Sequence, residues 1–348
     1  MISAAYTEGE GFCITDTPIP EIGPDDVLLR VQAASICATD VKIARCGHNK
    51  LAPGQRIVLG HEFVGVIEKC GDRVHGLAPG MRVGAAPNWG CGRCRACIRG
   101  MANLCPDFSA FGINTDGAQA PYVRIPGEAI AQGNVVELPA NVPWDEASLA
   151  EPVSCVLNAQ KVVSVAPGET VLIYGAGPMG MLHLLVARAI GASTIVMIDR
   201  NPKRLAKALE LGADEVIDNS VESVAQRLSV LRGDQGADVA IIAVPVRELA
   251  QEALGLLAPF GRLCLFAGLR GDVSVTLDGN AIHYRNLYVT GTTGGAAVDY
   301  RAAVALIASR RVDVRPVISH RFPFTQLKEA YDVAMGLEGL KIVLTAEN

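Results

Sequence analysis

The hydrophobic runs in the first third of the chain are short and are separated by turn residues. Val27–Val31 and Phe63–Glu68 are apolar or β-branched, and pairs such as Gly23-Pro24 and Pro79-Gly80 stand between such runs. This pattern is typical of strands joined by tight turns, and it continues to about Leu138. It predicts an all-β region with strands at Val27–Val31, Ile57–Leu59, Phe63–Glu68 and Met81–Ala85.

The pattern changes near Pro143, where strand-like and helix-like segments begin to alternate. Trp144–Ala150 is expected to be helical, and Glu151-Pro152 to end that helix, because a residue before proline is biased towards extended backbone. The alternation continues to about residue 290 and predicts a parallel sheet with helices on both faces. The expected strands are Val171–Tyr174, Thr194–Ile198, Val216-Ile217, Val239–Ala243, Arg262–Phe266 and Leu287–Val289, and helices are expected up to Ala189 and at Pro202–Leu211, Ser223–Leu231 and Glu248–Leu257.

The last part of the chain follows a Gly/Thr-rich turn at 291–295. Helices are expected at Tyr300–Ser309 and Phe324–Met335, and a terminal strand at Lys341–Leu344. We predict an α/β protein with a β-rich domain at 1–152 and a doubly wound parallel-sheet domain at 153–290. Residues 291–348 are expected to return to the first domain.

Four cysteines lie close together in Gly90–Cys105, which reads GCGRCRACIRGMANLC. Four thiolates at such spacing suit a closed tetrahedral Zn²⁺ site, which would stabilise a lobe at about 90–106 rather than catalyse a reaction. An iron–sulfur cluster is the main alternative, but the spacer before the last cysteine has seven residues here, not the three typical of ferredoxins. The expected structural zinc ligands are Cys91, Cys94, Cys97 and Cys105, with Arg93, Arg95 and Arg99 offsetting their charge.

Composition and charge narrow the function classes. The chain has 348 residues, half of them hydrophobic, and a formal net charge of −5. This mild negative charge argues against a nucleic-acid-binding protein, which would carry an excess of basic residues. The apolar stretch 175–192 contains Pro178, His183 and Arg188 and is not expected to span a membrane. The N-terminus lacks the pattern of a signal peptide, and ten cysteines without an export signal favour a reducing, cytoplasmic compartment.

A glycine-rich turn follows the predicted strand Val171–Tyr174. Residues 175–180 read GAGPMG, a pattern that lets backbone approach a pyrophosphate at a helix N-terminus. Asp199 ends the next strand, 19 residues after Gly180, where a carboxylate pairs with ribose hydroxyls and repels a 2′-phosphate. This favours NAD over NADP, although Arg200 and Arg204 offer charges that a 2′-phosphate would accept. The expected cofactor contacts are Gly175, Gly177, Pro178, Met179, Gly180, Asp199, Arg200, Arg204, Val244, Gly291 and Thr292.

Other candidate metal ligands are scattered along the chain. Cys37 lies in SICATD, His61 and Glu62 in GHE, and Glu151 in AEP. A mixed set of Cys, His and carboxylate can leave an open position on zinc, as catalytic sites require. Each residue alone is a weak signal, because a single cysteine or histidine is more often a structural residue than a ligand.

The order of SICATD, GHE, the four-cysteine lobe, AEP and GAGPMG resembles the medium-chain, zinc-dependent alcohol dehydrogenases over essentially the whole chain. Glu151 in AEP is similar to their polyol branch, which includes sorbitol/iditol, galactitol-phosphate and threonine dehydrogenases. The resemblance implies a GroES-like catalytic domain and a Rossmann NAD-binding domain. It further implies that Cys37 and His61 bind a catalytic zinc, with Glu62 or Glu151 alternating with water.

The resemblance also implies roles for residues near Cys37. Asp40 would orient His61, and Thr39 would contact the substrate oxygen or relay its proton. Two positions depart from the family pattern: Ala38 replaces a usual glycine, and Lys42 stands where many relatives carry a relay histidine. The proton path is therefore expected to run through Lys42 or through water.

The expected function is NAD-dependent oxidation of a secondary alcohol, a polyol or a sugar-derived alcohol, with two Zn²⁺ per chain. The alternatives are a threonine-type dehydrogenase acting on an amino alcohol, a non-catalytic NAD-binding protein of the same fold, and an iron–sulfur electron carrier. The expected partners are a small-molecule substrate and further copies of the chain, with no nucleic acid and no membrane. An uncovered edge strand at Leu287–Val289, and the dimers and tetramers of the family, predict a homotetramer, with a dimer second.

Overall fold

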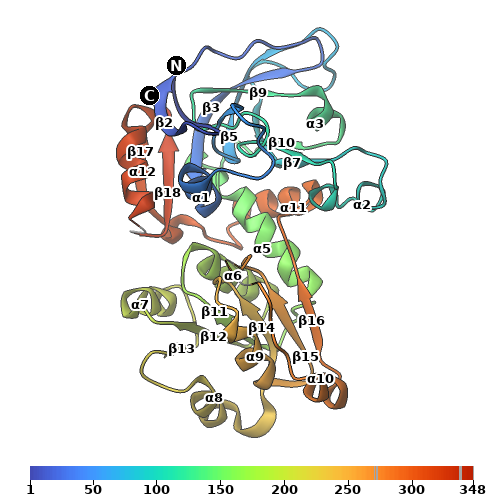
Figure 1. The fold of residues 1–348 in the computed structure, drawn as a ribbon, viewed down its shortest axis with the longest axis vertical. Helices are drawn as coiled ribbons and strands as arrows, with labels where there is room; N and C mark the ends of the chain where they lie inside the picture. The colour runs from blue at the N-terminus through green and yellow to red at the C-terminus, as the bar shows by residue number, and fades with distance from the viewer. Residues whose placement is uncertain (270, 272, 337–338, 348) are drawn as a thin grey trace. The chain divides into compact units, whose positions relative to one another are not determined.

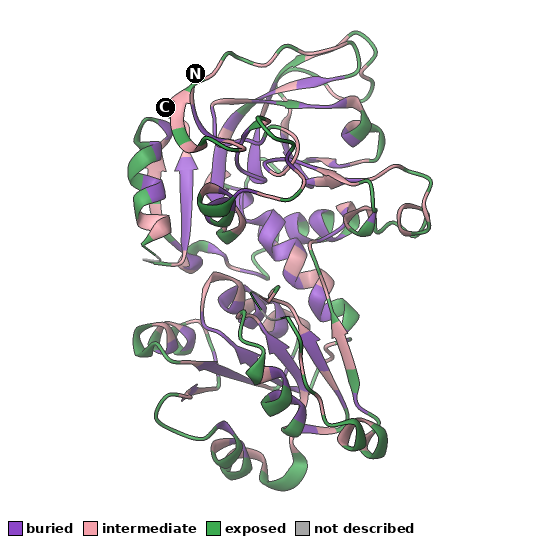
Figure 2. Cartoon of the chain, viewed as in Figure 1, coloured by how far each residue is buried: buried purple, intermediate pink, exposed green. Residues whose placement is uncertain are grey.

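The computed structural model describes residues 1–269, 271, 273–336 and 339–347, and their contacts divide the chain into two units (Figure 1). Unit 1 comprises Met1–Ser154 and Gly295–Asn348, and unit 2 comprises Cys155–Gly294. Among the described residues no helix is both long and apolar enough to cross a bilayer. Each unit has its own buried core, as the purple segments of Figure 2 show.

Unit 1 is built around β3 (Val27–Ile36), which pairs with β5 (Glu62–Cys70), β9 (Tyr122–Ile125) and β18 (Lys341–Thr345). Alternate residues of β3 are apolar and fully buried, and they form part of the main core. The pairing of β18 with β3 places the end of the chain beside its beginning. The other strands are β1 (Ile2–Thr7), β2 (Gly11–Asp16), β4 (Arg56–Val58), β6 (Arg82–Ala85), β7 (Asn88–Trp89), β8 (Ser109–Ala110), β10 (Val135–Glu137) and β17 (Ile318–Pro323).

The helices of unit 1 are mostly short. The helices are α1 (Ala38–Cys46), α2 (Arg95–Ile98), α3 (Gly127–Ala131), α4 (Trp144–Ala147), the start of α5 (Ala150–Val162), α11 (Ala297–Ala308) and α12 (Leu327–Met335), with 3₁₀ turns η1 (Ala102–Leu104), η3 (Arg315–Val317) and η4 (Phe324–Gln326). Helix α1 begins directly after Cys37 and ends at Gly47, whose positive φ of 69° suits glycine. Two of the predicted catalytic residues, Thr39 and Lys42, therefore lie on a helix.

Unit 2 is a six-stranded parallel sheet in the order β13-β12-β11-β14-β15-β16. All five residues of β11 (Thr170–Tyr174) are buried, because a central parallel strand is covered on both faces. The other strands are β12 (Thr194–Asp199), β13 (Glu215–Asp218), β14 (Ala237–Ile242), β15 (Leu257–Leu265) and β16 (Tyr288–Gly291), and the helices are α6 (Pro178–Ile190), α7 (Pro202–Glu210), α8 (Val224–Arg232), α9 (Glu248–Gly255) and α10 (Gly279–Arg285), with the turn η2 (Gly233–Gln235). The predicted doubly wound parallel sheet is confirmed.

Two predictions of local structure were wrong. Glu151 and Pro152 do not end a helix; they lie in the first turn of α5, which runs on to Val162. Proline is tolerated there because the first N–H groups of a helix lack intrahelical partners. The region before Leu138 is not all-β either, since it contains α1 and α3. The sequence pattern did not indicate α1, which has nine residues. Its buried apolar residues Val41 and Ile43 are two positions apart, a spacing that is typical of a strand rather than a helix.

Candidate functional site

The four cysteines of the predicted structural zinc site are brought together. One sulfur from each of Cys91, Cys94, Cys97 and Cys105 lies within 4.8 Å of the others. Gly90 makes this approach possible, because a Cβ there would lie 2.4 Å from the Cys97 sulfur. Backbone N–H groups of Arg93 and Cys94 lower the pKa of Cys91 to about 6, so its thiolate is available at neutral pH. Four thiolates with no other ligand type fit a closed zinc site.

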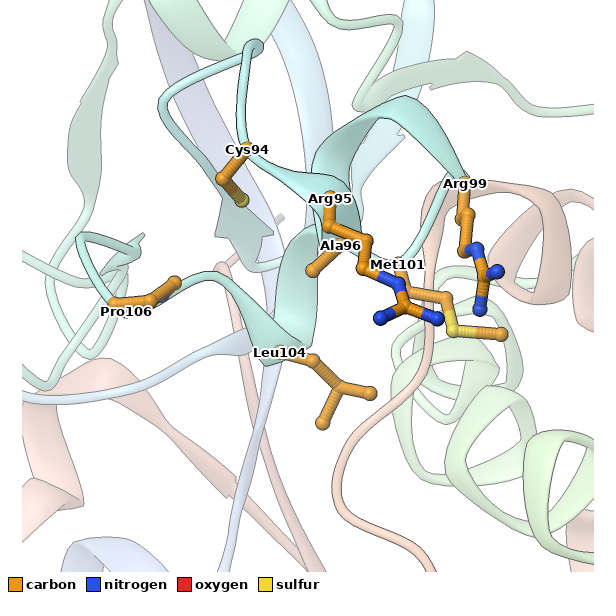
Figure 3. Close-up of a pocket in the computed structure, with 7 residues that line it drawn as sticks. All are labelled: Cys94, Arg95, Ala96, Arg99, Met101, Leu104 and Pro106. Carbon is orange, nitrogen blue, oxygen red and sulfur yellow. The ribbon is translucent and has the colours of Figure 1, made fainter.

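The outer surface of this lobe is partly apolar. A depression of about 370 Å³ is lined by Cys94, Arg95, Ala96, Arg99, Met101, Leu104 and Pro106. Figure 3 shows the side chains of Arg95, Arg99 and Met101 gathered on the same side of it. Of the four structural cysteines only Cys94 lines this depression, and none of the predicted catalytic residues does.

A second group of candidate ligands lies deeper in unit 1. Atoms of Cys37, His61 and Glu62 lie within 4.8 Å of one another, and the side chains of His61 and Glu62 are buried. Cys37 is the residue before α1, His61 is the residue before β5 and Glu62 is its first residue, so both pieces of chain are anchored by regular structure. One thiolate, one imidazole and one carboxylate are a donor set that fits a catalytic zinc with an open position.

Asp40 lies beside one nitrogen of the His61 ring. Its Oδ1 lies 3.3 Å from Nδ1 of His61, and its Oδ2 accepts a hydrogen bond of 2.8 Å from the backbone N–H of Cys37. Burial would lower the pKa of His61, but the charges of Asp40 and Cys37 raise it well above its ordinary value. With Nδ1 directed to Asp40, the other ring nitrogen is left for the metal.

Glu62 is held by two residues that sequence reasoning missed. Lys341, at the start of β18, places its Nζ 2.5 Å from both carboxylate oxygens of Glu62, and the hydroxyl of Ser35 donates to Oε2. Lys341 is only 3% exposed. Burial lowers the pKa of Lys341, but the charges of Glu62, Cys37 and Glu151 outweigh that effect and raise it. A lysine at the first position of an apolar strand is normally interpreted as the exposed end of that strand. The sequence pattern therefore gave no sign that Lys341 is buried and paired with Glu62.

The remaining predicted catalytic residues lie in the same unit but outside the cluster. Glu151 is buried in α5. The pKa of Tyr300 is raised, first by the burial of its own hydroxyl and then by the charge of Glu151. Thr39 is half-buried on α1, and Lys42 is exposed one turn further on. Lys42 and Lys50 both lower the pKa of His48, after the larger effect of burial.

The glycine-rich turn has the geometry that its sequence predicts. Gly175 has a φ of 103°, and a Cβ on Gly180 would lie 1.7 Å from the carbonyl oxygen of Gly175. Glycine is therefore required at both positions. Pro178 is the first residue of α6, and Met179 follows it, so the N-terminus of the helix opens directly at the turn. Val244 packs against this turn, since a Cβ on Gly175 would meet its side chain at 2.5 Å.

Asp199 and Gly291 end two strands of the parallel sheet, β12 and β16, and the carboxyl ends of such strands are where doubly wound sheets bind nucleotides. Asp199 ends β12 and accepts hydrogen bonds from the backbone N–H of Ala176, at 2.6 Å, and of Arg200, at 2.7 Å. Arg204, on α7, passes close to the turn, with a guanidinium nitrogen 3.9 Å from the Cβ position of Gly177. Gly291 ends β16, and the Thr292 N–H approaches the Leu265 carbonyl at 3.4 Å.

Comparisons with known proteins agree with both units. Residues 23–139 match the family model "Alcohol dehydrogenase GroES-like domain", and residues 178–309 match "Zinc-binding dehydrogenase". The chain is 31% identical to the L-threonine 3-dehydrogenase of Bacillus subtilis over 339 residues, covering 96% of this chain and 95% of that protein. It is 32% identical to the L-idonate 5-dehydrogenase of Vitis vinifera, covering 93% and 89%.

Solved structures give the same result. A zinc-binding dehydrogenase from Sinorhizobium meliloti 1021, solved with NADP, superposes with a TM-score of 0.90 at 29% identity over 99% of this chain and 98% of that one. An alcohol dehydrogenase from E. coli CFT073, solved with NADH, superposes with a TM-score of 0.89 at 27% identity over 99% of each chain. Relatives of this fold thus include proteins solved with either dinucleotide.

Proposed function

Because this chain belongs to the medium-chain, zinc-dependent alcohol dehydrogenases, we propose that it oxidises a polyol or sugar-derived secondary alcohol with NAD. The grouping of Cys37, His61 and Glu62 within 4.8 Å is the observation that carries the proposal. Three protein ligands leave a position open for water or substrate, whereas a structural zinc site is closed by four protein ligands. When bound, zinc would acidify the alcohol hydroxyl, and NAD would accept the hydride.

The residues of this chain would supply binding and proton transfer. Cys37 and His61 would hold the catalytic zinc, and Glu62 or Glu151 would share the remaining position with water. Thr39 lies two residues after Cys37 on the same helical turn, where its hydroxyl can meet a substrate oxygen. Lys42, one turn later and exposed, or water would carry the proton to solvent.

We propose NAD rather than NADP as the cofactor. The supporting observation is Asp199, whose carboxylate is tied to the backbone of the glycine-rich turn by Ala176. A carboxylate held there repels a 2′-phosphate. Arg204 favours the opposite choice, since its guanidinium lies near Gly177.

One experiment tests the function directly. The purified protein is mixed with NAD or NADP and a panel of polyols, sugar phosphates, L-threonine and simple alcohols, and reduced cofactor is followed by absorbance. Elemental analysis in parallel should give two zincs per chain. Oxidation of a polyol with NAD is expected. One zinc, iron, or no turnover with any alcohol would refute the proposal.

A threonine-type amino-alcohol dehydrogenase is the second candidate. It is favoured by the match to an L-threonine 3-dehydrogenase over nearly the whole chain. Faster turnover of L-threonine than of any polyol in the panel would select this candidate.

We also propose a homotetramer, with a dimer second, in the cytoplasm. The edge strand β16 pairs only with β15 among the described residues, and Tyr288 on it is 62% exposed. An open strand edge with an exposed aromatic residue favours pairing with another copy. A stable monomer by light scattering at micromolar concentration would refute this assembly.

A further inference from the structure

A line of buried polar groups runs behind His61, away from the proposed metal. The hydroxyl of Tyr331 donates to Oε1 of Gln119, and Nε2 of Gln119 donates to Oδ2 of Asp40 at 2.9 Å. Oδ1 of Asp40 faces Nδ1 of His61 at 3.3 Å. Gln119 and Asp40 are fully buried, and Tyr331 is 1% exposed. None of these groups can exchange its partner for bulk water.

The backbone holds Gln119 against the segment that carries His61. The N–H of Gln119 donates to the carbonyl of Leu59 at 2.8 Å, and its own carbonyl accepts from Ala4 at 3.1 Å. Gly60 has a φ of 98°, and a Cβ on it would lie 2.6 Å from the Gln119 side chain. The glycine before His61 therefore leaves the space that the Gln119 side chain fills.

Tyr331 is fixed independently from the C-terminal part of the chain. It lies on α12, and its ring packs against Phe12 of β2 with centroids 4.5 Å apart. Its hydroxyl therefore reaches Gln119 from a rigid position. Because the hydroxyl donates to the amide oxygen, the amide of Gln119 must present its N–H to Asp40.

The two carboxylate oxygens of Asp40 have different partners: Oδ2 accepts hydrogen bonds from N–H groups, and Oδ1 faces His61. Oδ2 accepts two N–H donors, one from the Cys37 backbone and one from Gln119. These bonds prevent rotation of the carboxylate and keep Oδ1 directed at His61. An Oδ1 held 3.3 Å from Nδ1 makes a charge contact rather than a close hydrogen bond, and it favours a proton on Nδ1, which leaves Nε2 with the lone pair that a metal needs.

We propose that Gln119 and Tyr331 are positioning residues of the catalytic metal centre, acting through Asp40 on His61. The inference depends on the proposed function, because it assumes that His61 binds a metal. Loss of either residue should loosen the catalytic zinc without altering the four-cysteine site.

The test measures the release of zinc to a chromogenic chelator from the zinc-loaded protein. A Cys37→Ala variant identifies the catalytic phase, since that phase should be missing from its trace. Gln119→Leu should speed the catalytic phase about tenfold, the lower end of the effect of removing a direct partner of a ligand, because Gln119 acts on His61 only through Asp40. Tyr331→Phe should speed it about fivefold, the effect of one lost hydrogen bond.

A double variant and a matched control show whether the residues act in sequence. Gln119→Leu with Tyr331→Phe should release zinc no faster than Gln119→Leu alone, because Tyr331 acts only through Gln119. Tyr174→Phe removes another buried tyrosine hydroxyl, which donates to Glu252 at 3.1 Å in unit 2, and should leave both phases unchanged.

The outcomes separate the two proposals. Zinc release at the wild-type rate in both single variants would overturn the inference. Equal acceleration of the catalytic and structural zinc phases with a lower melting temperature would also overturn it, because that result indicates a merely structural role. Additive effects in the double variant would remove Tyr331 from the line. Absence of a catalytic zinc phase from the wild-type protein would overturn the proposed function and this inference with it. If Gln119→Leu does not fold, Tyr331→Phe, which removes one oxygen atom, still decides.

Discussion

Replacement of Lys341 by methionine should destabilise the protein strongly, because it leaves a buried charge without its counter-ion. Glu62 is fully buried and Lys341 is 3% exposed, with Nζ 2.5 Å from Oε1. After the change, the Ser35 hydroxyl is the one partner of Glu62 that remains among these contacts. Removal of one member of a buried ion pair costs about 3–5 kcal/mol.

The expected loss is large enough to be measured by thermal or urea unfolding at pH 7, followed by circular dichroism of the zinc-loaded protein. At about 2–4 °C per kcal/mol, the melting temperature should fall by roughly 6–20 °C. Lys341→Met combined with Glu62→Gln should recover most of this loss, because a neutral amide needs no counter-ion; the comparison is made at equal zinc content, since Glu62 is a proposed zinc ligand.

An exposed ion pair provides the control. Lys328 and Asp332 lie 2.8 Å apart, but their side chains are 72% and 63% exposed. Lys328→Met should therefore leave the melting temperature nearly unchanged, since water solvates the remaining carboxylate. A Lys341→Met variant within about 1 kcal/mol of the wild type would refute the reasoning, because such a value is typical of an exposed pair.

The other predictions concern the metal sites, the cofactor and pH. Cys91→Ala should mainly lower stability, whereas Cys37→Ala should abolish turnover and retain a cooperative melt. Melting curves and rates with the opposite pattern would mean that the structural and catalytic zinc sites have been assigned the wrong way round. Asp199→Ala should raise the KM for NAD and narrow its advantage over NADP, unless the wild type already prefers NADP in steady-state kinetics. Glu151→Gln should keep the fold and NAD binding but lose most of kcat, and near-normal kcat with intact zinc would contradict a role at the metal. Burial lowers the pKa of His183 to about 3, so unfolding takes up a proton between that pH and about 6.5. The contribution of His183 to stability should therefore fall by about 1.4 kcal/mol per unit as the pH is lowered through this window, and in urea titrations the pH slope of the wild type should exceed that of His183→Gln by this amount.

Sequence alone located the features whose residues are close together along the chain. The four cysteines span Cys91 to Cys105, a separation of 14 residues, so their spacing is sufficient to bring them together in a short loop. The turn at 175–180 is similar: the strand before it, the helix after it and the need for glycine can all be read locally. The parallel sheet followed from the alternation of strands and helices.

Tertiary structure decided the contacts between residues that are distant along the chain. Lys341 and Glu62 are separated by 279 residues, and Tyr331 and Gln119 by 212. No periodicity or spacing records such a pair, because each partner is placed by a different strand or helix and only the packing of β18 and α12 brings them together. The error at Glu151-Pro152 has the same origin: the local bias before a proline is weak, and the packing of α5, whose residues from Ala150 to Val153 are all buried, overrides it. Local patterns thus predicted which residues could bind metal and nucleotide, whereas the buried contacts that orient His61 and Glu62 depend on the folded chain as a whole.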